Sequence, residues 1–199
     1  AGAPDSITVS STGSVKPTSG TAVTMDSNHA VTNHGTIAVA NASGATGILG
    51  NAGTSGDIVN SGTITIDEPY APTDTDNDGD LDGPFALGGN RFGIRTAGGH
   101  TGKIVNSGTI TVEGNDSAGI WLGGPLTGAF THDGTSTVTG NQSVGVHAEA
   151  IAGNVRLAGT VAAKGENAVG ARFTGDVAGA MGVQGSIGAT GYRYTSVPA

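Results

Sequence analysis

The chain contains no cysteine, few aromatic residues and few charged ones. The absence of cysteine excludes the disulfide framework that stabilises many small secreted proteins. Aromatic residues make up 4% of the chain and charged residues 12%, so small and branched aliphatic side chains must fill the core. No apolar run approaches the length of a membrane-spanning helix, and we expect no membrane insertion by this segment.

Positive charge is also scarce, which limits the possible partners. The net charge is −8, with 8 Lys and Arg against 16 Asp and Glu. Proteins that bind nucleic acid need a basic surface, so we expect no nucleic-acid partner. Much of the negative charge is concentrated in one stretch, at Asp67, Glu68, Asp74, Asp76, Asp78, Asp80 and Asp82.

Glycine is abundant, and it recurs within a repeated motif. The clearest copies, at 58–64 and 104–110, both read Ile-Val-Asn-Ser-Gly-Thr-Ile. Six copies align on one glycine with spacings of 27, 46, 26, 25 and 26 residues, at Gly35, Gly62, Gly108, Gly134, Gly159 and Gly185. A fixed period of this size is typical of a solenoid, and the long interval is one period carrying an insertion of about 20 residues.

Each period holds three apolar stretches separated by corners rich in Gly, Asn and Ser. One stretch follows the aligned glycine, a second lies one corner later, as at 118–122, and a third closes the period, as at Ile58 and Ile104. We therefore predict an all-β parallel β-helix with three short strands per rung and six to seven rungs of about 26 residues. Residues 1–199 are predicted to form one β-helix domain, with 1–29 as a weak first rung or cap and 67–91 as an inserted acidic loop.

Alternation along the strands assigns side chains to two faces. The glycines are expected to supply corner backbone angles, and Asn33, Asn60 and Asn106 are expected to form an amide ladder. On the strand after the glycine, the inward residues are predicted to be Ile37/Val39, Ile64/Ile66, Ile110/Val112, Ser136/Val138, Val161/Ala163 and Ile187/Ala189. On the next strand they are predicted to be Phe92/Ile94, Ala118/Ile120/Leu122, Val144/Val146/Ala148 and Val169/Ala171/Phe173.

The recurring Ile-Val-Asn-Ser-Gly-Thr-Ile-Thr motif resembles the passenger repeats of bacterial autotransporters and related large surface adhesins. The resemblance covers roughly residues 30–190. It implies a right-handed parallel β-helix, export across the outer membrane and display at the bacterial cell surface. It also implies low cysteine content, which this chain shows.

The insertion contains the most specific motif of the chain. Residues 74–82 read Asp-Thr-Asp-Asn-Asp-Gly-Asp-Leu-Asp, which matches the Asp-x-Asp-x-Asp-Gly-x-x-Asp spacing of calcium loops. Acids at alternate positions place oxygens around one point, and the glycine permits a sharp turn. The motif resembles EF-hand-like loops of the dockerin and thrombospondin type 3 kind. That resemblance implies side-chain ligands from Asp74, Asp76 and Asp78, a main-chain carbonyl from Asp80, and Asp82 as a direct or water-mediated ligand.

This loop departs from a full EF-hand, because Phe85 stands at the position of the bidentate Glu. Nearby prolines also disfavour flanking helices, so we expect a lone loop with Glu68 or Asp67 available to complete the ligand shell. The alternative is a solvated acidic loop without an ion. Acids this close would otherwise repel one another, so we predict a Ca²⁺ that orders the insertion rather than one that acts in catalysis.

Outward positions on the second strand of each rung form a column that could bind a partner. The column contains Leu49 followed by Arg95, Trp121, His147 and Arg172, and Trp121, the only tryptophan, is predicted to be exposed. An aromatic ring flanked by basic side chains could dock a sugar or a protein, although such a column could also be ordinary surface. The last four residues are the candidate binding residues.

A second outward column runs along the first strand. It resembles the flat threonine arrays of ice-binding solenoids, although Thr suits any exposed strand position. Its members are Thr36, Thr63, Thr109, Thr135, Thr160 and Ser186.

The sequence offers little for catalysis. Arg91, Arg95 or Lys103 near the acidic loop could serve a calcium-dependent enzyme acting on polysaccharide, but the Lys and Arg residues are few and scattered. The 5 histidines form no metal-ligand pair of recognised spacing. We therefore expect no enzymatic activity and keep the polysaccharide-acting enzyme as an alternative.

The main hypothesis is an exported, extracellular segment at the bacterial cell surface that acts as a structural stalk or adhesin. Its partner would be a glycan or protein on a host or neighbouring cell. Because solenoid ends expose unpaired strand edges and residues 182–199 read as an incomplete rung, self-association into a fibre or surface layer is a further alternative. Ice binding through the threonine column is another.

Overall fold

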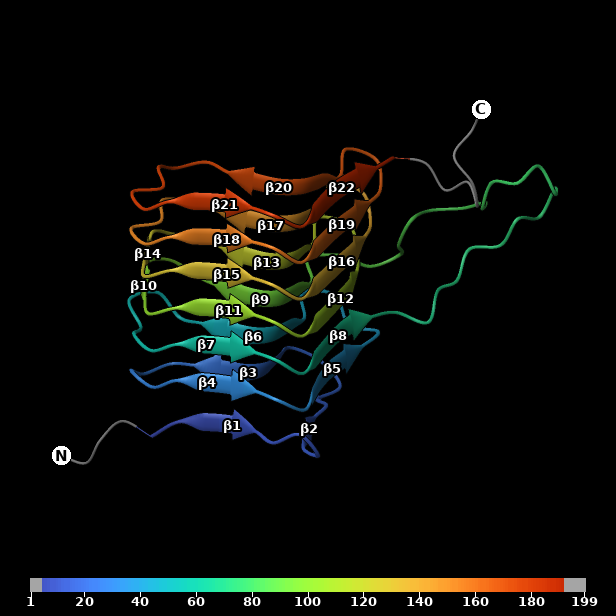
Figure 1. Cartoon of the computed structure of the whole chain (residues 1–199). Helices are drawn as coiled ribbons and strands as arrows, with labels where there is room; N and C mark the ends of the chain where they lie inside the picture. The colour runs from blue at the N-terminus through green and yellow to red at the C-terminus, as the bar shows by residue number, and fades with distance from the viewer. Residues whose placement is uncertain (1–4, 192–199) are drawn as a thin grey trace.

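The computed structural model describes residues 5–191, which wind through 22 short strands, β1 to β22. Figure 1 shows these strands stacked in successive turns along one axis, with β1 at one end and β20 to β22 at the other. Each strand pairs in parallel with the equivalent strand one turn away. The described residues contain no helix, and therefore none long and apolar enough to cross a membrane.

Three parallel sheets, here called A, B and C, form the sides of the solenoid. Sheet A contains β1 (Ile7–Val9), β4 (Val31–Asn33), β7 (Ile58–Asn60), β11 (Ile104–Asn106), β15 (Phe130–His132), β18 (Val155–Leu157) and β21 (Met181–Val183). Sheet B contains β2 (Ser14–Val15), β5 (Thr36–Ala40), β8 (Thr63–Asp67), β12 (Thr109–Glu113), β16 (Thr135–Thr139), β19 (Thr160–Lys164) and β22 (Ser186–Thr190). Sheet C contains β3 (Thr21–Met25), β6 (Thr46–Gly50), β9 (Phe92–Thr96), β13 (Ala118–Leu122), β17 (Val144–Ala148) and β20 (Val169–Phe173). A short pair, β10 (His100–Thr101) and β14 (Leu126–Thr127), lies at the corner between sheets C and A.

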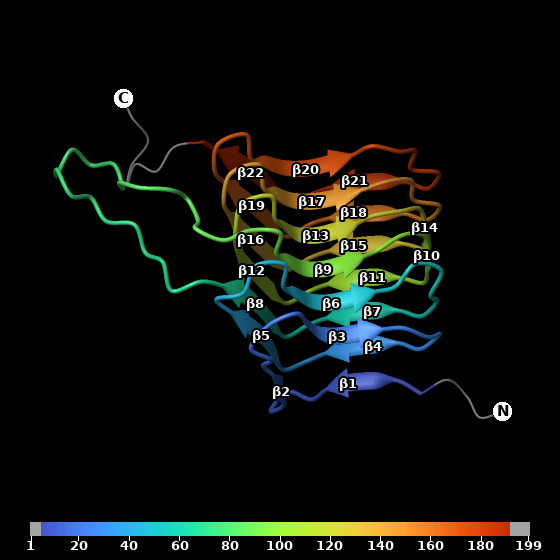
Figure 2. The same cartoon turned by 180° about the vertical axis from the view of Figure 1, so that it is seen from behind.

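The winding is right-handed, and the predicted parallel β-helix with three strands per turn is confirmed. Seen from opposite sides in Figures 1 and 2, the strands of sheet A cross one side and those of sheet C return across the other. Sheets A and B each have seven strands, so the described chain makes about seven turns. The insertion leaves the stack after β8 and rejoins it at β9.

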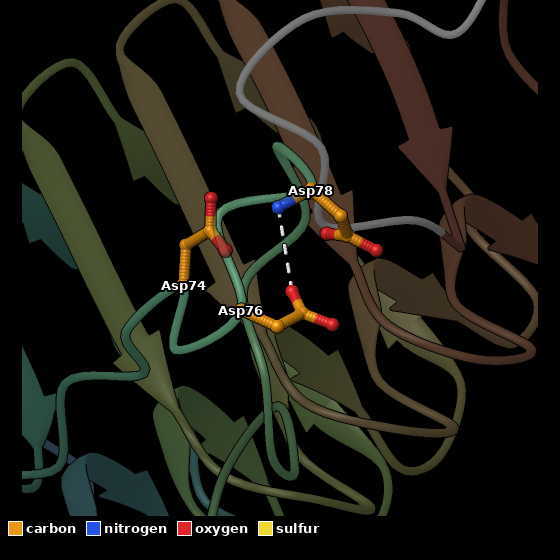
Figure 3. Close-up of side chains that lie close together, drawn as sticks. All are labelled: Asp74, Asp76 and Asp78. Carbon is orange, nitrogen blue, oxygen red and sulfur yellow. Dashed lines mark hydrogen bonds between the residues drawn. The ribbon is translucent and has the colours of Figure 1, made fainter.

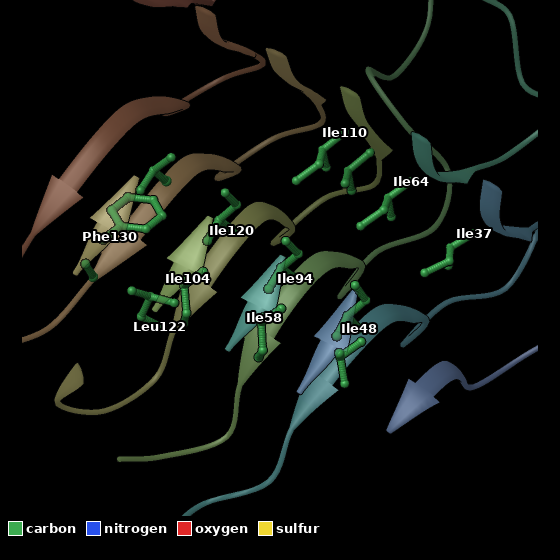
Figure 4. Close-up of a cluster of buried hydrophobic side chains, with 14 of the residues drawn as sticks. Ile37, Ile48, Ile58, Ile64, Ile94, Ile104, Ile110, Ile120, Leu122 and Phe130 are labelled. Atoms are coloured by element: carbon green, nitrogen blue, oxygen red, sulfur yellow. The ribbon is translucent and has the colours of Figure 1, made fainter. Parts of the chain in front are cut away.

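Stacked aliphatic columns form the core, as the alternation predicted. Ile37, Ile64 and Ile110 are completely buried and follow one another along sheet B. Figure 4 shows this column together with isoleucines from sheets A and C, which converge on the same interior. Like side chains stack because each turn repeats the pleat of the one before it. This regular core gives the rod a rigid wall on which the surface groups are placed.

The aligned glycines have a different role from the predicted one. The prediction that they provide special corner angles is wrong, because none of the six has a left-handed φ. Instead, a Cβ added at Gly62 would lie closer than 3.0 Å to the carbonyl oxygen of Gly35, and one at Gly108 would meet Gly62 in the same way. Glycine is required there because successive turns approach each other backbone to backbone.

The predicted amide ladder is present and continues further than expected. Asn33 Nδ2 donates to Asn60 Oδ1 and Asn60 Nδ2 to Asn106 Oδ1, both at 2.7 Å. Asn106 Nδ2 lies 3.2 Å from His132 Nδ1, and His132 Nε2 lies 3.1 Å from the carbonyl of Thr160. The Asn106 amide nitrogen can only donate and the Thr160 carbonyl oxygen can only accept. His132 is therefore neutral, with its proton on Nε2. A directed chain of hydrogen bonds thus crosses the core along the axis.

Sheet C departs from simple alternation at one glycine in each strand. A Cβ on Gly93 would strike the side chain of Ile110, so this glycine faces inward directly before the inward Ile94. The strand bends there, and the predicted inward position of Phe92 is wrong. The Phe92 ring instead meets Trp121 and Arg95.

The residues that pair with Phe92 in register along sheet C differ from it in burial. Ala118 and Val144 are 0% and 2% exposed, in agreement with their predicted inward positions. Val169, the next member of the column, is half-buried near the open end of the sheet.

The last described turn is open. Met181, Val183 and Ile187 are 47%, 53% and 37% exposed, although Ile187 lies in register with the buried Val161 and faces inward as predicted. No described strand lies beyond β20 to β22, which leaves their core-facing side chains uncovered. The end of the predicted incomplete rung, 192–199, lies outside the described residues.

Candidate functional site

The acidic insertion projects sideways from the solenoid as a long excursion (Figures 1 and 2). Its two ends are tied together by Glu68 and Arg91, here called the root clamp. Arg91 Nη1 lies 2.8 Å from Glu68 Oε2, and the two side chains are 2% and 5% exposed. Arg91 also donates from Nε to the Ala42 carbonyl at 2.9 Å and from Nη1 to the Glu113 carbonyl. The clamp fixes the point from which the loop leaves the rod.

The clamp also determines how Glu68 ionises. Burial opposes its charge, but hydrogen bonds from the N–H groups of Leu87 and Gly88, together with Arg91, hold the pKa of Glu68 below its ordinary value. The predicted role of Glu68 as an additional calcium ligand is wrong, because both of its oxygens are already engaged at the root.

Glu113 lies beside the clamp and behaves in the opposite way. Burial raises its pKa, and although the Glu68 N–H opposes this effect, the charges of Asp67 and Glu68 add to it. The root therefore brings the charges of Asp67 and Glu68 close to the Glu113 carboxyl group. No motif in the sequence predicts the Glu68–Arg91 pair, although the two residues lie at the two ends of the insertion.

The acidic loop brings three carboxylates together (Figure 3). One carboxylate oxygen from each of Asp74, Asp76 and Asp78 lies within 4.8 Å of the others. The turn that gathers them uses left-handed backbone at Asn77, φ 61°, and Gly79, φ 90°. These are the residue types that adopt this conformation at least cost.

Hydrogen bonds within the loop preorganise these acids. Asp74 Oδ2 accepts from the Gly79 N–H at 3.0 Å, and Asp76 Oδ1 accepts from the Asp78 N–H at 3.3 Å. Asp78 Oδ1 accepts from the N–H of Asp80 at 2.9 Å. The loop backbone thus wraps around its own carboxylates, as it does in calcium loops.

The remaining predicted ligands are placed differently. The Asp82 carboxylate accepts hydrogen bonds from the N–H and hydroxyl of Thr75, which fastens the two arms of the loop. Asp74 Oδ1 and Asp80 Oδ1 are shielded from solvent and have no hydrogen-bond partner among the described residues. The loop therefore retains unsatisfied anionic oxygens near the three clustered acids.

Mutual repulsion within the loop is visible in the pKa of Asp76. The hydrogen bond from the Asp78 N–H favours the charged form, but the charges of Asp78, Asp82 and Asp74 outweigh it and leave the pKa raised. A cation placed among these acids would remove that repulsion. The donor set consists only of oxygen, which suits a hard divalent cation.

The predicted aromatic column is in register but differs in exposure. Arg95, Trp121, His147 and Arg172 follow one another across β9, β13, β17 and β20. Trp121 is only partly exposed, and His147 is 7% exposed, so the prediction of an exposed Trp121 is wrong. The two rings stack with centroids 3.9 Å apart and an interplanar angle of 19°, because neighbouring turns bring like positions into contact.

This stacking changes what the column can bind. One face of Trp121 is covered by His147, and the Phe92 ring lies edge-on at 6.1 Å. Burial lowers the pKa of His147, and the positive charge of Arg172 lowers it further. The imidazole therefore stays neutral at pH 7. A sugar ring cannot stack on the covered face, and any ligand must approach from the side.

The other predicted surface groups are placed as follows. The threonine column is continuous in register along sheet B, for example Thr63 beside Thr109 and Thr109 beside Thr135. Arg91 lies buried in the clamp, so it is not available to contact a polysaccharide substrate. Lys103 is exposed and at a different corner, where its N–H bonds Asp57.

Comparisons of this chain with protein-family models, with curated proteins and with solved structures found no match.

Proposed function

We propose that this chain is a non-enzymatic segment of an exported bacterial surface protein, in which a rigid β-solenoid displays a calcium-ordered loop. The observation that carries the proposal is the cluster of Asp74, Asp76 and Asp78 on a projection fastened to the rod by a buried clamp. The role is that of a stalk or adhesin, with a glycan or protein on another cell as the partner.

In this proposal the carboxylates of Asp74, Asp76 and Asp78 bind Ca²⁺, with the Asp80 carbonyl and Asp82 completing the shell. The loop already has the acid spacing, the turn glycine and the carboxylate-to-backbone bonds that such a site needs. Calcium is abundant outside cells, so a site with a dissociation constant on the order of 10⁻⁴ to 10⁻³ M would be filled. The ion would order the projection and offset the charge repulsion among its acids.

Extracellular placement is supported by the resemblance of the repeats to those of exported surface proteins. A parallel solenoid of about seven turns also suits a stalk, because each turn contacts only its neighbours and the rod can be extended without altering the core.

Differential scanning calorimetry and limited proteolysis, each with Ca²⁺ or with EDTA, test the proposal. We expect Ca²⁺ to protect the 68–91 projection from cleavage and to raise its unfolding temperature. Asp76→Ala and Asp78→Ala should remove both effects, whereas Asp176→Asn, an exposed acid on the rod, should leave them intact. Equal cleavage and equal melting with Ca²⁺ and with EDTA would rule out calcium ordering.

End-to-end self-association is a second candidate, favoured by the exposed apolar side chains of Met181, Val183 and Ile187. Met181, Val183 and Ile187 belong to the same columns as Ile7, Val9 and Val15 in the first turn. A second copy could therefore continue the stacking in a head-to-tail manner. Light scattering across a concentration series should show growth that Ile187→Lys prevents, and a strict monomer at all concentrations would exclude it.

A further inference from the structure

A groove lies on the corner between sheets B and C, beside the Trp121 and His147 stack. Its volume is about 520 Å³, and its walls come from three successive turns. The residues used below are Asp116, Trp121, Gln142, Val144, Asn167 and Arg172; together they are called the corner groove. Its size falls within the usual range for small-molecule sites.

The chemistry of the corner groove is that of a site for neutral hydroxyl groups. Gln142 and Asn167 can each donate and accept hydrogen bonds, Asp116 only accepts and Arg172 only donates. The one negative and one positive charge balance, so the groove has no formal net charge to select a phosphate or a cation. Val144, 2% exposed, offers little apolar surface, so the apolar contact comes from the part of the Trp121 ring that His147 does not cover.

The backbone at this corner sets the positions of the polar residues. Asp116, Gln142 and Asn167 all have left-handed φ, of 51°, 57° and 56°. Asn90, in the turn below and outside the groove, has φ 58°, and Gly20 and Gly44 have φ of 74° and 73° at the same corner of lower turns. The conformation therefore recurs along the corner, and in three consecutive turns it places a polar residue at the groove.

We propose that the corner groove binds a neutral oligosaccharide through its hydroxyl groups, with the sugar C–H surface against the side of Trp121. The row of polar side chains follows the solenoid axis, one per turn, so the glycan chain lies along the rod. This proposal rests on the adhesive part of the proposed function and names its ligand class, but it does not depend on the calcium loop.

The test is isothermal titration calorimetry of the full chain in EDTA with cellotriose, maltotriose, tri-N-acetylchitotriose and, as the acidic comparison, trigalacturonate. At least one neutral trisaccharide should bind, and Trp121, the only tryptophan, should report it through a change in emission. Because calcium is absent, failure of the calcium proposal does not affect the result. Binding of no neutral trisaccharide, or equal binding of trigalacturonate, overturns the proposal.

Substitution by glycine separates binding from folding. Gln142→Gly and Asn167→Gly remove groove side chains at positions whose φ already suits glycine, so the melting temperature should stay the same or rise. We expect the dissociation constant to increase about tenfold or more. Asn90→Gly is the matched control, since Asn90 has φ 58° in the turn below the groove and should bind as the parent does. Arg172→Met, at an exposed position, should also weaken binding. Unchanged affinity in all three groove variants would refute the assignment.

Discussion

Removal of Arg91 should destabilise the protein far more than its position at a loop boundary suggests. Arg91→Met keeps much of the side-chain volume but leaves the Glu68 carboxylate, 5% exposed, without its counter-ion. It also removes donors to the carbonyls of Ala42 and Glu113. Breaking one partner of a buried pair costs about 3–5 kcal/mol. In a chain of this size that corresponds to a fall in melting temperature of about 6–20 °C.

Urea unfolding followed by circular dichroism measures this free energy, and limited proteolysis shows whether the projection opens first. Glu68→Gln is the informative partner, because it keeps the side-chain shape and one oxygen, which can accept from the N–H of either Leu87 or Gly88; these two groups bond different oxygens of Glu68. It should cost less than Arg91→Met. The double variant should cost less than the two single variants together, since no buried charge is left unpaired. A loss below about 1 kcal/mol for Arg91→Met would refute the argument, because that is the value of an exposed ion pair.

Three further predictions follow from the core and the aromatic column. Burial lowers the pKa of His132, although the Thr160 carbonyl and the charge of Asp133 act to raise it. The neutral imidazole therefore stabilises the fold above pH 6.5, and this stabilisation is lost as the pH falls through the folded-state pKa. His132→Asn should flatten part of the stability–pH curve measured by urea unfolding. Gly62→Ala should destabilise by about 1–3 kcal/mol or more because its Cβ meets the Gly35 backbone, whereas Gly188→Ala, which has open space around it, should stay within about 0.5 kcal/mol in the same assay. Trp121 emission should change with a midpoint below pH 6.5 as His147 is protonated, and His147→Gln should abolish that transition; a midpoint above 6.5 would contradict the burial of the imidazole.

The repeats made the architecture predictable, because residues one period apart in the sequence of a solenoid lie side by side on neighbouring turns. The Ile37, Ile64 and Ile110 column and the Asn33, Asn60 and Asn106 ladder both follow from that rule. The same rule predicts that His132 continues the amide ladder, since it pairs in register with Asn106. It was missed because the ladder was sought as a repeat of one residue type rather than as a column of hydrogen-bonding groups.

Alternation failed where the backbone is not a regular strand. The inward Gly93 bends β9, and a period of two counted through that bend assigns Phe92 to the wrong side. Exposure of Trp121 was misjudged for a related reason, since residues that share a column across turns cover one another. Outward direction therefore did not imply an exposed ring.

The root clamp could not be predicted from the sequence, because it lies outside the repeat. Glu68 and Arg91 are 23 residues apart, and neither belongs to the repeat. They meet because the insertion must leave and return at neighbouring points of the same corner. Their pairing depends on the depth of burial there, which no spacing of residues encodes.

The most direct test of the central claim is isothermal titration of Ca²⁺ into the intact chain. The acid cluster of Asp74, Asp76 and Asp78 predicts one site per chain, with a dissociation constant on the order of 10⁻⁴ to 10⁻³ M, which Asp76→Ala abolishes. No binding at millimolar Ca²⁺, or an unchanged isotherm in Asp76→Ala, would contradict the account of this protein as a rod that displays a calcium-ordered loop.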